Sequence, residues 1–195
     1  IRNLLTKYLR YKKQKNICLS IKKILKKEVR TVIDVGANKG EFSKASLDVF
    51  KLAKVYAFEP IPQLFKDYLL NIKNKRFVRF MFALSDKNSI SEFNYNLDRK
   101  RKSSLLNIIE NNNFRIKIKT KKFDSLNIKI KRPCFLKIDV EGAEKLVLKG
   151  FKKNLNKIEV IQLEVNFSRN FEGQAKISEL IYFLEKYHFK GFIQK

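Results

Sequence analysis

The sequence is poor in the residues that build metal and redox sites, with two cysteines and one histidine among 195 residues. Cys18 and Cys134 lie far apart and match no metal-ligand or redox spacing. We therefore expect both thiols to be reduced, as in a cytosolic protein. His188 falls between a predicted helix and a terminal strand, so we interpret it as a turn or edge residue rather than a catalytic base.

Long apolar runs, repeats and linkers are also lacking. The uninterrupted apolar runs fall well short of the ~18 residues that cross a bilayer, and no signal-peptide core occurs. No stretch rich in glycine and serine or in proline divides the chain, and its length fits one domain. We expect a cytoplasmic protein, although a sequence that begins at Ile1 rather than methionine leaves a preceding anchor open.

Acidic residues are scarce, because 19 Asp and Glu face 44 Lys and Arg and give a formal charge of +25. A net positive charge of this size produces an electric field that attracts polyanions, such as nucleic acid, an anionic membrane surface or an acidic glycan. The excess is mostly lysine, accompanied by many Asn and Ile, as an AT-rich coding sequence would give whatever the partner. The charge therefore leaves open both a polyanion-binding surface and a solvated lysine coat.

Basic residues are dense in the first 30 positions, where 4-LLTKYLRYKKQK-15 and 19-LSIKKILKKEV-29 predict one or two amphipathic helices. We treat 1–30 as a helical extension of a domain at 31–195. The extension either packs on the domain with its lysines outward or binds nucleic acid or a membrane surface, which would make the protein peripheral to the membrane.

From Thr31 onward, apolar runs typical of strands alternate with segments of helical spacing. The strand-like runs are 31–35, 54–59, 77–84, 134–139 and 158–164, and the helical segments are 41–51, 61–72, 143–151 and 175–187. This rhythm predicts an α/β fold, a mostly parallel central sheet with helices on both faces. Residues 89–96 and 114–123 alternate polar and apolar and predict additional strands around a polar insertion, 97–113.

The first strand runs into 33-IDVGANKGEFS-43, where Gly36 and Gly40 permit a tight turn and a close ligand. The pattern is D-x-G-x-N-x-G rather than the dinucleotide fingerprint G-x-G-x-x-G. The acid Asp34 would repel a pyrophosphate and favour a cation. S-adenosylmethionine carries two cationic groups, a sulphonium and an α-ammonium.

Acids also follow the later strands. Glu59, in 57-AFEP-60, follows Gly36 at about the 20-residue separation at which an acid accepts hydrogen bonds from ribose hydroxyls. At 83-ALSD-86, the backbone or Asp86 could meet an adenine amine, and a plain turn capped by Ser85 and Asp86 is the other interpretation.

Three acids crowd 136-LKIDVEGAEKLVLKG-150. Asp139 falls at the carboxyl end of a strand, where open parallel sheets place ligands, and strand alternation would put Glu141 on the same side. For Glu141, support of the following helix through its dipole is the alternative. Glu144 falls in the first helical turn, and we expect it to pair with Lys145 or a nearby lysine.

The segments 32-VIDVGANKGEFS-43, 58-FEPIP-62, 83-ALSDKNS-89, 123-FDSL-126 and 136-LKIDVEGAEKLVLKG-150 resemble the FkbM family of S-adenosylmethionine-dependent methyltransferases. The resemblance covers roughly residues 30 to 193. It implies the Rossmann-like class I methyltransferase fold and methylation of hydroxyl groups on sugars, glycans and other small metabolites. Class I sheets usually finish with an antiparallel hairpin; we take 189–195 as the sixth strand and expect the seventh to be missing.

The resemblance also implies roles for individual residues. The methionine end of the cofactor would be lined by Asp34, Gly36, Asn38 and Gly40, the ribose held by Glu59, and the adenine approached by Asp86 beside Ser85. Asp139 and Glu141 would face the site of methyl transfer. Either would act as the general base, with Glu164 as the next candidate, or the pair would hold a divalent cation. RNA methylation and a non-catalytic membrane-associated module are the alternative functions, although the N-P-P-[YF] tetrapeptide of base-amine methylases is absent.

Overall fold

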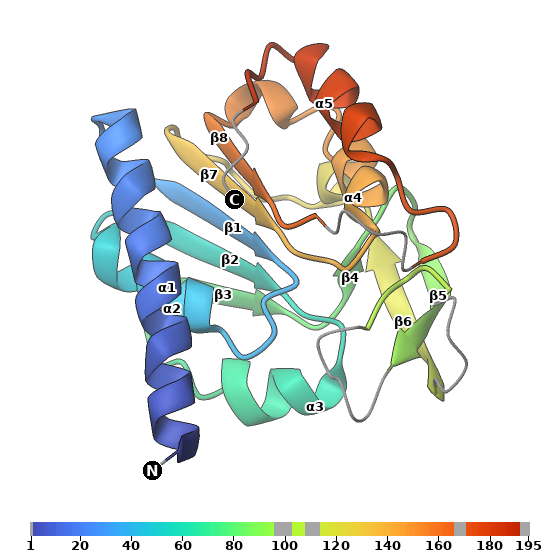
Figure 1. The fold of residues 1–195 in the computed structure, drawn as a ribbon, viewed down its shortest axis with the longest axis horizontal. Coiled ribbons are helices and arrows are strands. Elements are labelled where there is room, and N and C mark those ends of the chain that lie inside the picture. Colours follow the sequence, from blue (N-terminus) through green and yellow to red (C-terminus); the bar gives the residue numbers. More distant parts are fainter. Residues whose placement is uncertain (1, 96–102, 108–113, 166–170, 192–195) are drawn as a thin grey trace. The chain divides into compact units, whose positions relative to one another are not determined.

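The computed structural model describes residues 2–95, 103–107, 114–165 and 171–191, with side chains 2–4 and 7 left out. The chain forms two compact units, each with its own sheet (Figure 1). The first comprises Ile1–Ala83, Asn127–Ile138 and Lys157–Gln162, and the second comprises Leu84–Leu126, Asp139–Asn156 and Leu163–Lys195.

A five-stranded sheet of order β3-β2-β1-β7-β8 forms the centre of the first unit. The strands are β1 (Thr31–Val35), β2 (Lys54–Phe58), β3 (Phe77–Phe80), β7 (Cys134–Ile138) and β8 (Val160–Leu163). β1 pairs in parallel with β2 and β7, and β2 with β3. Every residue of β1 and β7 is buried, as expected of parallel strands covered on both faces. The mostly parallel sheet predicted from the sequence is therefore confirmed.

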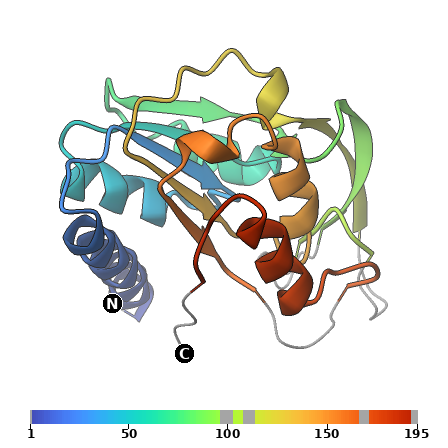
Figure 2. The same cartoon turned by 90° about the horizontal axis from the view of Figure 1, so that it is seen from above.

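One face of this sheet carries two helical layers. The inner layer is α2 (Glu41–Val49), whose Phe42 and Ala45 share a core cluster with Val32 of β1 and Phe135 of β7. The outer layer is α1 (Arg2–Leu25), which lies outside α2 (Figure 2) and adds the buried Cys18 to that cluster. The segment 1–30 thus contains one long helix, whose inward side packs against the core cluster of the first unit.

The predicted helix at 61–72 is shorter and less regular than expected. It begins with α3 (Pro62–Leu64), where proline fits the first turn because its missing N–H has no helical partner there. It continues as a π-helix, η1 (Phe65–Leu69). Leu69 and Ile72 join the core cluster under α2, so the segment still closes the same side of the unit.

The second unit contains a three-stranded sheet of order β4-β6-β5, made of β4 (Ala83–Leu84), β5 (Ser89–Tyr95) and β6 (Phe114–Lys121). β5 and β6 pair antiparallel from Ser89↔Thr120 to Tyr95↔Phe114, which confirms the two additional strands. The prediction of one strand over 77–84 is wrong. The run divides at the exposed Met81, because its end pairs with β6 and the N–H of Ser85 donates to the Lys121 carbonyl.

Two helices belong to the second unit, α4 (Glu144–Gly150) and α5 (Ile177–Glu185), with a 3-10 turn η2 (Phe123–Ser125); a further 3-10 turn, η3, spans Leu155–Lys157. Phe123 and Phe151 stack with ring centroids 4.1 Å apart. His188 lies in the turn after α5, as predicted. The terminal strand predicted at 189–195 is not formed at 189–191, and 192–195 lie outside the described residues. No helix in the described ranges is long and apolar enough to cross a membrane.

Candidate active site

The loop after β1 has left-handed backbone conformations at alternate residues. The φ angles are 79° at Gly36, 49° at Asn38 and 73° at Gly40. Glycine adopts this region without a steric penalty and asparagine tolerates it better than most side chains, which accounts for the D-x-G-x-N-x-G pattern. The N–H groups of Gly36 and Ala37 both donate to the Phe58 carbonyl at 3.0 Å, so the loop is anchored to the end of β2.

Glu59 holds this loop through both carboxylate oxygens. Its Oε2 accepts the N–H of Asn38 at 2.8 Å, and its Oε1 accepts the N–H of Ile61 at 2.9 Å. The residue is 3% exposed. The acid that was predicted from its spacing to the glycine loop therefore lies directly against that loop, and it ties together the segments that follow β1 and β2.

Gly40 is required by packing as well as by its backbone angle. A Cβ at this position would lie 2.8 Å from Ile72 Cδ1 and 3.0 Å from Leu69 Cδ2. Any larger residue would require the Ile72 or Leu69 side chain to shift. The positive φ and the close packing both favour glycine at this position.

Asp34 faces α2 and is fully buried. Its Oδ2 accepts a hydrogen bond from the Ser43 hydroxyl at 2.6 Å, and its Oδ1 lies 3.9 Å from Nζ of Lys137. Lys137 stands opposite Asp34 in the β1–β7 register, and its ammonium is 5.5 Å from the centroid of the Phe42 ring. Sequence reasoning missed Lys137, although a lysine inside the buried run 134-CFLKID-139 was the available signal.

Ser85 and Asp86 follow β4 rather than a strand of the parallel sheet. The interpretation that 83-ALSD-86 ends the third parallel strand is therefore wrong. The Ser85 hydroxyl donates to Asp86 Oδ1 at 3.3 Å. A Cβ on Gly150 of α4 would lie 2.2 Å from the Ser85 carbonyl oxygen, so this turn packs directly on the helix end.

The acidic motif after β7 forms a turn rather than an extension of the strand. β7 ends at Ile138, so the strand does not extend to Asp139 and Glu141, and strand alternation does not relate their side chains. Glu141 has a φ of 49° and Gly142 a φ of 93°. A Cβ at Gly142 would approach the Phe171 ring at 2.8 Å. A left-handed glutamate is uncommon, and strained residues of this kind concentrate at functional sites.

Glu144 folds back onto this turn, where its Oε1 accepts the N–H of Gly142 at 2.9 Å. Burial raises the pKa of its carboxyl; backbone N–H groups act in the opposite direction, and the charge of Asp139 adds to the rise. The predicted pairing with Lys145 is wrong, because Lys145 lies 2.7 Å from Glu179 while Glu144 is 2% exposed. Glu144 is a buried acid that stabilises the turn.

Ser104, which follows the undescribed part of the insertion, contacts the same turn. Its hydroxyl donates to the Glu141 carbonyl at 2.6 Å and accepts the Leu106 N–H at 3.1 Å. Its backbone pairs with Asn94 of β5 in an isolated bridge. Sequence reasoning gave the insertion no site residue, since the only signal was a pair of serines.

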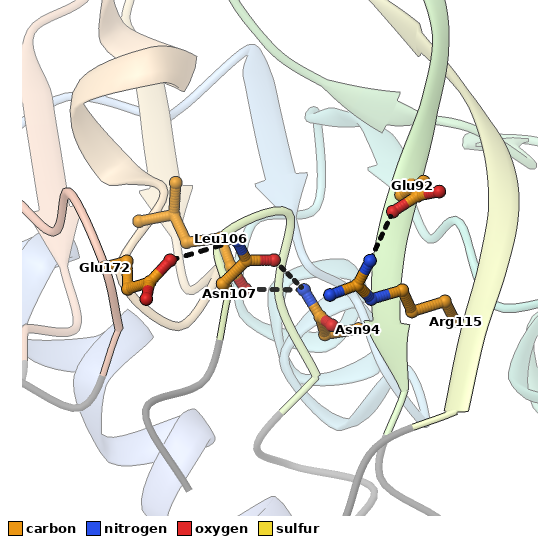
Figure 3. Close-up of polar contacts among 6 residues, drawn as sticks. All are labelled: Glu92, Asn94, Leu106, Asn107, Arg115 and Glu172. Carbon is orange, nitrogen blue, oxygen red and sulfur yellow. Dashed lines mark hydrogen bonds and ion pairs between the residues drawn. The ribbon is translucent and has the colours of Figure 1, made fainter. Parts of the chain in front are cut away.

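Amide side chains extend this network (Figure 3). Asn94 Nδ2 donates to the Leu106 carbonyl at 2.9 Å and contacts Asn107 Oδ1 at 3.4 Å. Asn107 Nδ2 donates to Glu172 at 3.0 Å. The segment 103–107 is therefore fixed between β5, the acidic turn and the chain near Glu172. Of the predicted insertion, 97–102 and 108–113 lie outside the described residues.

Glu164 is exposed and lies just beyond β8. Within the described parts of the chain, no group of three or more His, Cys, Asp or Glu residues is arranged to hold a metal ion. The divalent-cation alternative therefore gains no support from the acids at 139–144. Both cysteines are buried and free.

A parallel sheet whose first loop is clamped by an acid, followed by the K-I-D-V-E-G-A-E turn, defines a Rossmann-like methyltransferase fold. The family model of the methyltransferase FkbM domain matches residues 34–190. The chain therefore belongs to the FkbM methyltransferase family. No curated protein matches the sequence closely enough to count as a relative.

One solved structure is similar, a proposed methyltransferase from an antibiotic biosynthesis pathway of Anabaena variabilis. The two chains are 11% identical and superpose with a TM-score of 0.46 over 88% of this chain. The match covers 60% of the other chain, so this protein spans less than two thirds of that neighbour's length.

Proposed function

We propose that this protein is an S-adenosylmethionine-dependent O-methyltransferase whose acceptor is a hydroxyl group on a sugar, a glycan or another small metabolite. The observation that carries the proposal is the Glu59 clamp on the left-handed loop at Gly36–Gly40, in a chain of the FkbM methyltransferase family. Pre-ordering of such a loop lowers the entropy lost when a ligand binds it.

The polar groups around the first loop of the first unit are suited to this cofactor. Glu59 brings a carboxylate, which is an acceptor for hydroxyl groups, directly against this loop, and we assign it to the ribose hydroxyls. We assign Gly36, Asn38 and Gly40 to the loop along the methionine end. Asp34 accepts a hydrogen bond from Ser43 in the first turn of α2 and so links the end of β1 to the helix that follows the loop. Ser85 and Asp86 remain the proposed contacts of the adenine.

When bound, S-adenosylmethionine would supply a methyl group activated for displacement by its sulphonium. The chain must then remove the proton of the acceptor hydroxyl as the new bond forms. We propose Asp139 or Glu141 as the carboxylate that takes this proton, and Glu164 as the next candidate. Because the backbone at 141–142 is held by Ser104 and Glu144, the residue that carries the Glu141 carboxylate would be positioned before the acceptor arrives.

Calorimetry with S-adenosylhomocysteine tests the cofactor assignment. In Glu59→Gln an amide NH₂ would face one of the two backbone N–H donors, so binding should weaken at least tenfold. Asp67→Asn, an exposed acid in η1, is the matched control and should bind as the wild type does. Absence of binding to the wild-type protein, or equal binding to Glu59→Gln, would contradict the proposal.

RNA methylation is the second candidate, favoured by the formal charge of +25. Incubation with labelled S-adenosylmethionine separates the two, using a mixture of small glycans in one reaction and total RNA in the other. Label in the small-molecule fraction would support O-methylation of a small molecule. Label in the RNA would instead support RNA methylation and contradict the leading proposal. Loss of RNA affinity with added salt would show nonspecific phosphate contact and says nothing of methylation.

A further inference from the structure

The outward side of α1 carries apolar and basic side chains together. The inward stripe at 11, 14, 18, 21 and 25 faces α2, with Cys18 fully buried and Ile21 and Leu25 packed against the same cluster. Spacings of three and four also generate a second stripe, at 5, 9, 12, 16, 19 and 23, on the opposite side of the helix. Figure 2 shows α1 as the outermost layer over α2.

The apolar members of the outward stripe are well exposed. Leu5 is 56% exposed, Leu9 54% and Leu19 42%, and the flanking Tyr8 and Ile24 are 58% and 69% exposed. Surface leucines that occur singly need no explanation, but here they recur along one side of a helix. Such a side is typical of a helix that binds an apolar surface.

The charges on the same side have one sign. Lys12 and Lys23 of the stripe and Lys13 and Lys15 at its margins are exposed, and the sequence of α1 contains no acidic residue. Within the helix, its lysines therefore have no carboxylate to pair with. A partner that covers this side must supply negative charge close to an apolar layer.

We propose that the outward stripe of α1 (Leu5, Leu9, Lys12, Leu19 and Lys23) binds the surface of an anionic phospholipid membrane, with the helix lying in the plane of the interface. Lipid headgroups neutralise the lysines, and the acyl boundary receives the leucines. This binding is separate from the proposed methyl transfer, since it uses neither the Glu59 loop nor the acidic turn.

Two other occupants fit less well. Nucleic acid would neutralise the lysines through its phosphates but would leave Leu9 and Leu19 in water. A second copy of the chain, packed through the same stripe, would bring Lys12 and Lys23 against like charges and is disfavoured on that ground. A membrane surface satisfies both kinds of side chain at once.

The test is co-sedimentation of the full chain with vesicles of phosphatidylcholine alone and of phosphatidylcholine with phosphatidylserine. Binding is expected only with phosphatidylserine present. The variant Lys12→Gln/Lys13→Gln/Lys23→Gln should bind on the order of a hundredfold more weakly, since each lysine near the surface contributes about fivefold. The matched control Lys66→Gln/Lys73→Gln/Lys75→Gln changes three exposed lysines elsewhere in the first unit and should bind as the wild type does.

The variant Leu9→Gln/Leu19→Gln keeps every charge and should also lose binding by at least tenfold, with an unchanged circular dichroism spectrum. If it binds vesicles as the wild type does while the Lys12 variant is weakened, contact is by charge alone and the proposal fails in favour of a general polyanion surface. If the control variant Lys66→Gln/Lys73→Gln/Lys75→Gln weakens binding equally, the effect is one of net charge and the proposal also fails. A change of oligomeric state in Leu9→Gln/Leu19→Gln would assign the stripe to self-association.

Discussion

The ammonium nitrogen of Lys137 lies 3.9 Å from Oδ1 of Asp34, and the two side chains are 4% and 0% exposed. The pair joins the two signature segments of the family, because Asp34 precedes Gly36 in the first loop and Lys137 precedes Asp139 in the acidic turn. Their register across β1 and β7 places the charges side by side under Phe42 of α2. One buried ion pair thus aligns the strands from which both loops start.

Replacement of Lys137 by methionine should leave Asp34 buried without its cation. Removal of one partner of a buried pair costs about 3–5 kcal/mol, so we expect the free energy of unfolding to fall by roughly that amount. Urea denaturation measures it. Lys54→Met, on the same sheet but exposed, is the control and should lie within about 0.5 kcal/mol of the wild type.

The double variant Asp34→Asn/Lys137→Met separates pairing from packing. If the two charges interact, removal of both should cost less than the sum of the single changes. A strictly additive result, or a Lys137→Met protein as stable as Lys54→Met, would show that the pair does not stabilise the sheet.

Glu141 combines a left-handed backbone with a proposed catalytic carboxylate. Asparagine tolerates its φ of 49° better than glutamate does, so Glu141→Asn should be at least as stable as the wild type in thermal unfolding. If Glu141 is the base, both Glu141→Asn and Glu141→Gln should lose transfer by about 10²-fold or more while binding S-adenosylhomocysteine normally. Retained transfer in both variants would exclude Glu141 and leave Asp139, with Glu164 as the next candidate for the base.

Ser104 should control the order of the acidic turn. Ser104→Ala removes the donor to the Glu141 carbonyl and the acceptor of the Leu106 N–H, which should cost about 1–3 kcal/mol. Amide hydrogen exchange at 140–142 should accelerate, whereas exchange in β1 should not. Ser178→Ala, at an exposed position in α5, is the control. Unchanged exchange at the turn would show that the hydroxyl does not hold it.

The strands β1, β2 and β7 were predictable because each is a short apolar run whose residues are all, or all but one, buried. The prediction for β1 matched its bounds, 31–35, and those for β2 and β7 were each one residue too long. The run 77–84 failed because apolar character does not indicate which neighbour a strand pairs with. The division after Phe80 depends on hydrogen bonds to β6, whose register with β4 no local pattern encodes.

The glycine loop and Glu59 could be predicted because their spacing follows from a strand–turn–helix unit. Lys137 and Ser104 could not, since each acts on a residue that the fold brings from elsewhere in the chain. Ser104 and Glu141 are 37 positions apart, and Lys137 meets Asp34 through strand register. Glu144 was misjudged because its place in the first helical turn predicted pairing with a nearby lysine, whereas the residue is buried.

Glu144 should give the protein a pH-dependent stability of unusual sign. Burial raises the pKa of its carboxyl above the ordinary value of 4.5. Between that value and the native pKa, the native state holds a proton that the unfolded chain has lost. Stability therefore falls as the pH rises from about 4.5 through the native pKa, by at most about 1.4 kcal/mol per pH unit for one group.

Glu144→Gln keeps an acceptor for the Gly142 N–H and cannot ionise. Its free energy of unfolding should exceed that of the wild type by an amount that grows with pH across this interval and then levels off. Urea denaturation at a series of pH values measures the difference. Glu179→Gln serves as a control of opposite sign, because the hydrogen bond from Lys145 lowers the pKa of that carboxyl and its contribution is lost as the pH falls. Parallel stability curves for wild type and Glu144→Gln would show that Glu144 has the same pKa in the native and unfolded chains.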